Sequence, residues 1–217
     1  MDYELQKIMN LLRAYKIRKY RNSFPYTPIS DKKKFVFIHI PKAAGTSVRI
    51  ALGEPPTGRR HLPWWVYEAA SGEKFKSYFK FTVVRNPISR TLSGYTYMLN
   101  GGNKTETDMI ISSHIKKYKD FDDFVINGLV NNNLIQHHIF KPQVEYVCCW
   151  QGNLKVDKVL KLERLADDFR EIAERLGIQQ RIGVVNSSSK DIEAYVSEGA
   201  KSKLKMLYQK DFATFSY

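Results

Sequence analysis

Two short apolar runs dominate the hydrophobic pattern of the chain, at Phe35–Ile40 and Phe79–Val84. Both are rich in β-branched and aromatic residues, which is typical of strands buried on both faces of a parallel sheet. The polar positions are His39 in the first run and Lys80 and Thr82 in the second. Two further runs, Tyr146–Trp150 and Lys155–Leu162, predict another pair of strands around a turn at 151–153. Helical segments separate these runs, so the pattern predicts an α/β fold with a central parallel sheet flanked by helices.

The helical periodicity is clearest at Leu165–Leu176, where five apolar residues share one face and Gly177 follows as a C-terminal stop. A second helix is predicted over Pro87–Leu99, since the fixed φ of proline suits a first helical turn. Ser197 is the expected N-cap of the last helix. Each of these helices lies between or after the predicted strands, as a three-layer α/β arrangement requires.

Residues 1–20 place apolar positions among lysines and arginines at helical spacing, which predicts a basic amphipathic helix. This helix would dock on the domain or lie on an anionic membrane, and we favour docking. We therefore divide the chain into an N-terminal basic amphipathic segment, residues 1–33, and a single domain, residues 34–217. The sequence shows no transmembrane run or signal peptide. We expect a cytoplasmic protein, with peripheral attachment to the inner face of the membrane through residues 1–20 as the alternative.

The charge balance indicates acidic partners. The chain has 35 basic and 22 acidic residues and a net charge of +13. Such an excess suits a nucleotide, an anionic polysaccharide, nucleic acid or a membrane surface, and charge alone does not choose among them. Cys148 and Cys149 are neighbours and cannot join distant segments, which favours a reducing compartment over a disulfide framework.

The turn after the first strand has the composition of an anion-binding site. Pro41 ends the strand, Lys42 supplies a cation, and Gly45 lets the backbone approach a ligand closely. Thr46 and Ser47 add hydroxyl groups, and Ser47 is the expected N-cap of the next helix. Backbone N–H groups and the helix dipole at such a turn favour phosphate or sulfate. The turn is not the usual nucleoside-triphosphate loop, because its lysine precedes the glycine; a plain strand–helix turn with a solvated lysine is the alternative.

A second motif follows the second strand. Arg85 lies at the strand end and Ser93 eight residues later, and both could face the crevice beyond the carboxyl ends of the strands. Both motifs resemble segments of sulfotransferases that use 3′-phosphoadenosine 5′-phosphosulfate (PAPS). The turn after the first strand, P-K-x-x-G-T-S, resembles their 5′-phosphosulfate loop. The segment after the second strand, R-N-P-x-x-R-x-x-S-x-Y, resembles their 3′-phosphate segment. Over residues 34–217 the chain resembles the carbohydrate-type family that includes heparan sulfate 2-O-sulfotransferases and short bacterial relatives.

The resemblance implies a P-loop-like fold with a parallel sheet of four or five strands. It also implies transfer of a sulfuryl group from PAPS, as co-substrate, to a hydroxyl of a carbohydrate or glycoconjugate, which could itself be anionic. Lys42 and Ala44–Ser47 would hold the 5′-phosphosulfate, and Arg85 and Ser93 the 3′-phosphate. No metal is expected in this chemistry. The polar stretch with Asn186 and Ser187 is a further candidate for nucleotide binding, with a plain linker as the alternative.

Two histidines are candidates for the general base that takes the proton of the acceptor hydroxyl. His61 follows the anion-binding turn, and the unperturbed pKa of histidine lies nearest neutrality. His138 belongs to an H-x-x-K-P-Q run that resembles a family segment near the acceptor. The segment around His61 lacks the H-x-H pattern of the heparan enzymes. A surface histidine at 61 and a packed histidine at 138 are the alternatives.

Two other function classes would explain part of the pattern. A nucleotide-dependent kinase shares the strand, loop and helix, but it should show an acidic magnesium ligand at a strand end and a lysine after the loop glycine. A non-catalytic nucleic-acid-binding module accounts for the positive charge and leaves the paired phosphate motifs without a purpose. We therefore predict a PAPS-dependent sulfotransferase that does not bind specific nucleic acids; its oligomeric state is open.

Overall fold

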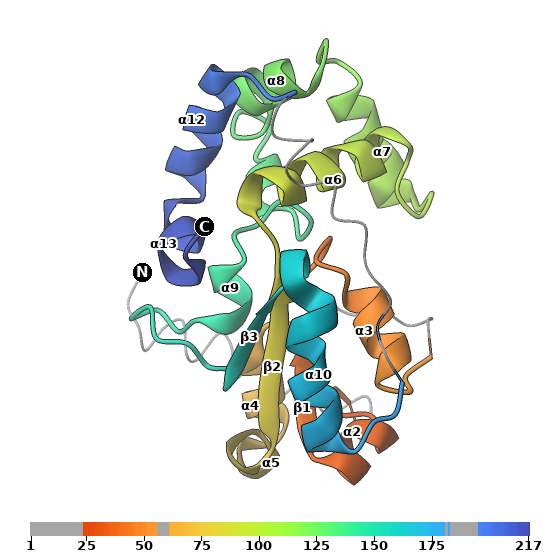
Figure 1. Ribbon diagram of the computed structural model, residues 1–217. Helices are drawn as coiled ribbons and strands as arrows, with labels where there is room; N and C mark the ends of the chain where they lie inside the picture. Colours follow the sequence, from red (N-terminus) through yellow and green to blue (C-terminus); the bar gives the residue numbers. More distant parts are fainter. Residues whose placement is uncertain (1–23, 56–60, 181, 183–194) are drawn as a thin grey trace. The chain divides into compact units, whose positions relative to one another are not determined.

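The computed structural model describes residues 24–55, 61–180, 182 and 195–217 (Figure 1). Their contacts form two compact units, each assembled from separate stretches of chain. The first unit lies within Met1–Ile40, Ala44–Val84 and Val144–Val185, and the second within Pro41–Ala43, Arg85–Gln143 and Asn186–Tyr217. The predicted basic helix at residues 1–20 falls outside the described residues, so the boundary at residue 33 stays a prediction.

The first unit is built on a parallel sheet of three strands, in the order β1 (Phe35–Ile38), β2 (Phe79–Val84) and β3 (Lys158–Lys161). All four residues of β1 are buried, as are the last four of β2. Ile38 pairs in register with Thr82, so the carboxyl ends of these two strands lie at the same edge of the sheet. The loops that follow β1 and β2 therefore leave the sheet at one edge, as the sequence predicts.

Helices flank this sheet, which confirms the predicted α/β class (Figure 1). The amphipathic helix α10 has the predicted bounds and ends at Gly177 in the left-handed conformation. It packs on β3, where the Asp168 carboxylate accepts a hydrogen bond from the Lys161 N–H at 3.1 Å. The helical elements of the unit are α2 (Pro28–Lys33), α3 (Gly45–Ala51), α4 (Trp64–Ala70), α5 (Gly72–Ser77), α9 (Val144–Val147), the 3₁₀ turn η3 (Leu162–Arg164) and α10 (Leu165–Leu176).

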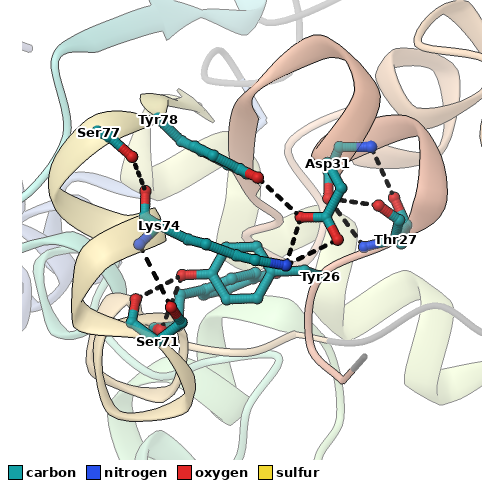
Figure 2. A network of polar contacts seen from close by, with 9 residues as sticks. Tyr26, Thr27, Asp31, Ser71, Lys74, Ser77 and Tyr78 are labelled. Atoms are coloured by element: carbon teal, nitrogen blue, oxygen red, sulfur yellow. Dashed lines mark hydrogen bonds and ion pairs between the residues drawn. The ribbon is translucent and has the colours of Figure 1, made fainter. Parts of the chain in front are cut away.

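A polar network joins α2 to α5 in the first unit (Figure 2). Lys74 donates to both carboxylate oxygens of Asp31 at 2.9 and 2.8 Å, and the Tyr78 hydroxyl donates to Asp31 Oδ1 at 3.0 Å. The hydrogen bond to Asp31 raises the pKa of Lys74. The Tyr26 hydroxyl donates to the carbonyl of Tyr67, and burial raises the pKa of Tyr26. The network fixes the segment that enters β1.

The second unit is helical around an aromatic core (Figure 1). The Phe124 ring lies 5.2 Å from Tyr95 and 5.4 Å from Phe140 between centroids. The fully buried Tyr208 donates its hydroxyl to the Phe140 carbonyl at 2.6 Å, and burial raises its pKa to about 12. The elements of the unit are α6 (Pro87–Leu99), α7 (Glu106–Ile115), α8 (Phe121–Asp123), the π-helical turn η1 (Phe124–Gly128), the 3₁₀ turn η2 (Leu134–Gln136), α12 (Glu198–Leu207) and α13 (Gln209–Phe215).

Three expectations are wrong in detail. The described part of the chain forms three sheet strands, where four or five were expected. Val144–Val147 is a helical turn and not part of a strand at 146–150, and of that expected strand only an antiparallel bridge between Cys148 and Leu154 remains. The other expected strand, within Lys155–Leu162, is present as β3. Helix α3 begins at Gly45 with Ala44 as its N-cap, so Ser47 lies inside the helix. A short apolar run does not by itself distinguish a helical turn from a strand.

None of the helices in the described ranges combines the length and apolar character needed to cross a lipid bilayer.

Candidate active site

The loop after β1 turns sharply through two left-handed residues. Lys42 has φ 65° and Ala44 has φ 57°, conformations that non-glycine residues rarely adopt. Each costs roughly 1 kcal/mol or more, so the surrounding structure must impose them. The Ala44 carbonyl accepts the Val48 N–H at 3.2 Å and starts α3, and no side chain at this N-cap accepts from the first helical turn. The N-cap is therefore Ala44, three residues before the serine that was expected to cap the helix, and the helix starts at Gly45.

Gly45 packs against the imidazole of His39 in the first unit. A Cβ atom added at position 45 would collide with Cδ2, Nε2 and Cγ of His39. Glycine is thus required here by a neighbouring side chain, a reason that the sequence analysis did not anticipate. His39 itself is only 5% exposed and stacks on Phe37, with ring centroids 5.9 Å apart.

His61 lies beside His39 in the same unit. Its Nδ1 is 3.1 Å from the His39 carbonyl oxygen, and the two rings are 4.4 Å apart between centroids. A carbonyl oxygen only accepts hydrogen bonds, so Nδ1 of His61 carries the hydrogen. The lone pair of the neutral ring is then on Nε2, which is the arrangement a general base needs. Arg59 and Arg60, which precede His61, lie outside the described residues.

Lys42 and Arg85 meet in the second unit. Arg85 Nη1 donates to the Lys42 carbonyl at 3.4 Å, and the Lys42 ammonium lies 4.1 Å from the centroid of the Tyr97 ring. Tyr97 is four residues after Ser93 on α6, so the two side chains share a helix face. Three of the predicted phosphate-binding residues, Lys42, Arg85 and Ser93, are thereby associated within one unit.

The main chain of Arg85 is fixed by the side chain of Gln143. Gln143 accepts from the Arg85 N–H at 3.0 Å and donates to the Arg85 carbonyl at 2.8 Å. Asp211 in turn accepts the Gln143 N–H at 2.8 Å, and both Gln143 and Asp211 are fully buried. A buried two-point amide contact of this kind leaves Arg85 little freedom at its backbone. The main chain of Arg85, which is predicted to bind a phosphate, is therefore held in a fixed position.

His138 lies on a segment that Arg90 holds against α6. The guanidinium of the fully buried Arg90 donates to the carbonyls of Ile139 at 2.9 Å and Lys141 at 2.6 Å. The His137 and His138 rings are 4.1 Å apart between centroids. Burial lowers the pKa of both histidines. The pKa of His137 falls to about 4, with the neighbouring His138 as the second cause. The Asp108 carboxylate acts in the opposite direction on both rings. Both rings are therefore neutral at pH 7.

The lowered pKa of His137 predicts an acid-sensitive fold. An unfolded chain binds a proton at this ring below pH 6.5, whereas the folded chain binds it only near pH 4. The contribution of the neutral His137 ring to the free energy of unfolding is therefore fully present above pH 6.5. It decreases as the pH falls from 6.5 to 4 and changes no further below pH 4, and the total loss is about 1–3 kcal/mol. Urea unfolding at pH 7 and pH 4.5 should show this loss, and His137→Gln should remove most of it. An unchanged loss in His137→Gln would contradict the assignment.

Comparison with known proteins assigns the family. A model of the Sulfotransferase family matches residues 62–217, which is well over half of the chain. The chain belongs to the Sulfotransferase family. No curated protein and no solved structure matches it. The family has a P-loop-like fold, which agrees with the parallel sheet, and it assigns sulfuryl transfer to the protein. The kinase and the non-catalytic nucleic-acid-binding module are therefore set aside.

The family match covers one half of the predicted site and not the other. It includes Arg85, Ser93 and His138 and begins one residue after His61, so the loop with Lys42 lies outside it. The resemblance of that loop to a phosphosulfate loop is thus an observation independent of the family match. Asn186 and Ser187 fall within the matched residues but outside the described ones, so their predicted role in this sulfotransferase stays a prediction.

Among the residues that the structure describes, no three His, Cys, Asp or Glu side chains gather as a metal site would require.

Sequence reasoning missed His39 and Asp211 and gave Gln143 a different place, near the acceptor. A signal existed for two of them. His39 is the one polar residue in an otherwise apolar strand run, and Asp211 falls on the buried stripe of the last helices between Tyr208 and Phe215. A polar residue on an apolar face is a reason to look for a buried partner. The contact of Gln143 with Arg85 joins positions 58 residues apart and has no local signal.

Proposed function

We propose that this sulfotransferase uses PAPS as its donor and sulfates a hydroxyl of a carbohydrate or glycoconjugate. The association of Lys42 with Arg85 carries the proposal, because it joins the two motifs that resemble the phosphosulfate and 3′-phosphate segments. Two cationic side chains, one in the turn after β1 and one directly after β2, suit a donor with two separate anionic groups. A nucleoside triphosphate carries its charge in one chain of phosphates and would not need both.

The proposed donor contacts follow from these positions. Lys42 and the N–H groups of Gly45–Ser47 bind the 5′-phosphosulfate, and the left-handed turn at Ala44 directs the start of α3. Arg85 and Ser93 bind the 3′-phosphate. Asn186 and Ser187 contribute to nucleotide binding from the stretch before α12.

The reaction is an in-line transfer. The acceptor hydroxyl oxygen bonds to sulfur while the bond between sulfur and the bridging phosphate oxygen breaks, which yields a sulfate ester and adenosine 3′,5′-bisphosphate. Positioning and charge stabilisation supply most of the catalysis in such a transfer. Lys42 stabilises the charge that develops on the bridging oxygen. The acceptor proton passes to His61 Nε2, whose ring is already held in the required tautomer; His138 is the second candidate.

The acceptor is proposed to be a saccharide, free or lipid-linked. The net charge of +13 favours an anionic one, since a basic protein concentrates acidic substrates at its surface. Residues 1–20 could add contact with an anionic membrane. The test is transfer of ³⁵S-labelled sulfate from PAPS to a panel of neutral and anionic glycans. Transfer of the label to a glycan, without hydrolysis of PAPS by the enzyme, supports the proposal. Hydrolysis of PAPS by the enzyme with no label on any glycan contradicts the proposed acceptor class.

Arg85→Ala should weaken the binding of one nucleotide and not of another. The variant should bind adenosine 3′,5′-bisphosphate about 10- to 100-fold more weakly, because a charge-assisted phosphate contact contributes roughly 1.5–3 kcal/mol. Its affinity for adenosine 5′-monophosphate, which has no 3′-phosphate, should stay nearly constant. Isothermal titration calorimetry measures both. Ser93→Ala should show the same pattern with a smaller loss.

The matched control for this comparison is Arg170→Ala, an exposed arginine on α10 that pairs with Asp167. It should change neither affinity. Equal losses for the two nucleotides in Arg85→Ala would remove the 3′-phosphate assignment.

A further inference from the structure

His39 contacts two of the proposed catalytic elements at once. Its imidazole fills the space beside the Gly45 α-carbon, where any Cβ would collide with it. The same ring lies 4.4 Å from the His61 ring at an interplanar angle of 64°. Gly45 is six residues later in the chain and His61 is 22 residues later, so His39 is where the two segments meet within the first unit.

The ring of His39 is itself held in place. It is 5% exposed and stacks on Phe37 of β1 at an interplanar angle of 16°. Its backbone carbonyl accepts the hydrogen of His61 Nδ1 at 3.1 Å. His61 is therefore fixed by one residue in two ways, through a hydrogen bond that selects its tautomer and through a ring contact that limits its rotation.

We propose that His39 is a positioning residue that keeps the His61 imidazole and the loop backbone at Gly45 in a fixed arrangement. This inference rests on the proposed function for its effect on turnover, because it takes His61 as the base and Gly45 as part of the phosphosulfate loop. The physical reason is geometric. A base and an electrophile displaced by about 1 Å from their productive geometry can lose on the order of 100-fold in rate.

The first test is spectroscopic and needs no activity. Nitrogen-15 NMR of the full chain, recorded at a pH where the ring is neutral, reports which nitrogen of His61 carries the hydrogen. The wild-type protein should show Nδ1–H. His39→Ala keeps the backbone carbonyl that accepts this hydrogen and so should keep the tautomer, but loss of the ring contact should make the His61 ring more mobile and broaden its resonances. An Nε2–H tautomer in the wild type, or a His61 ring whose mobility is unchanged in His39→Ala, would overturn the proposal. Should His39→Ala fail to fold, His39→Gln removes the ring with a smaller loss of volume and takes its place.

The second test is a double-mutant cycle between His39 and Gly45. Gly45→Ala alone should lower kcat by about 10- to 100-fold, because the new methyl group displaces the ring and the loop together. His39→Ala alone should lower kcat by a similar factor. In the double variant the methyl group occupies the space that the ring has left, so kcat should be no lower than in either single variant.

The cycle also distinguishes positioning from a purely structural role. A residue that only fills the core would lower the melting temperature of each variant and leave kcat of the folded fraction unchanged. Multiplied losses of kcat in the double variant would likewise contradict the proposal. If the wild-type protein transfers no sulfate from PAPS at all, the proposed function fails, and the mobility of the His61 ring in wild type and His39→Ala still decides whether His39 positions His61.

Discussion

His61→Gln is expected to lower kcat by about 10²- to 10⁴-fold, the usual contribution of a positioned acid–base group. Glutamine keeps a similar size and a donor toward the His39 carbonyl, and it has no basic nitrogen. The affinity for adenosine 3′,5′-bisphosphate should be unchanged, because the base acts on the acceptor. In the wild type kcat should fall toward acidic pH as the ring takes up a proton. That acidic limb should be absent in His61→Gln.

His138→Gln is the matched control for the base, since His138 is the second candidate. Its ring is neutral at pH 7, so its protonation state alone does not exclude it. If His138→Gln removes the acidic limb and His61→Gln keeps it, the base is His138 and the ring at 61 is structural.

Lys42→Ala is expected to lower kcat by ~100-fold or more, comparable to the loss of one preorganised stabilising group. Its charge is needed most when the bridging oxygen becomes negative, and interactions made only in the transition state affect kcat more than binding. Alanine keeps a Cβ at the left-handed position, so the strain of the loop is not relieved. Initial rates at saturating PAPS measure the effect. A raised KM with an unchanged kcat would make Lys42 a binding residue only.

Tyr97→Leu is the matched control for Lys42. It removes the ring beneath the ammonium and keeps the charge, so its effect on kcat should be well below that of Lys42→Ala. Equal effects of the two variants would mean that the placement of the ammonium by Tyr97, and not its charge alone, sets the rate.

Local signals in the sequence predicted the elements that carry the site. The bounds of β2 and α6 agree with the prediction, because a short run rich in aromatic and β-branched residues and a proline in a first helical turn are strong signals. The parallel direction of the strands, and with it the common edge at which β1 and β2 end, follows from the α/β pattern, whereas the strand order does not. The proximity of Lys42 and Arg85, which follow these two strands, could therefore be predicted from sequence alone.

The details of the loop could not be predicted, because they depend on contacts distant in sequence. The start of α3 at Gly45 reflects the left-handed Ala44 and the packing of Gly45 on the His39 ring. Serine propensity at an N-cap is weaker than that tertiary packing. The contact between Gln143 and Arg85 likewise exists only once the chain is folded. A polar residue on an apolar face was the one hint that the sequence offered.

The most direct measurement of the central claim is a pair of calorimetric titrations of the full chain, one with adenosine 3′,5′-bisphosphate and one with ATP and magnesium. A donor site with separate contacts for a 5′- and a 3′-phosphate should bind the bisphosphate more tightly. We expect the bisphosphate to bind with the lower Kd. An equal or lower Kd for ATP with magnesium would contradict the assignment of PAPS as the donor.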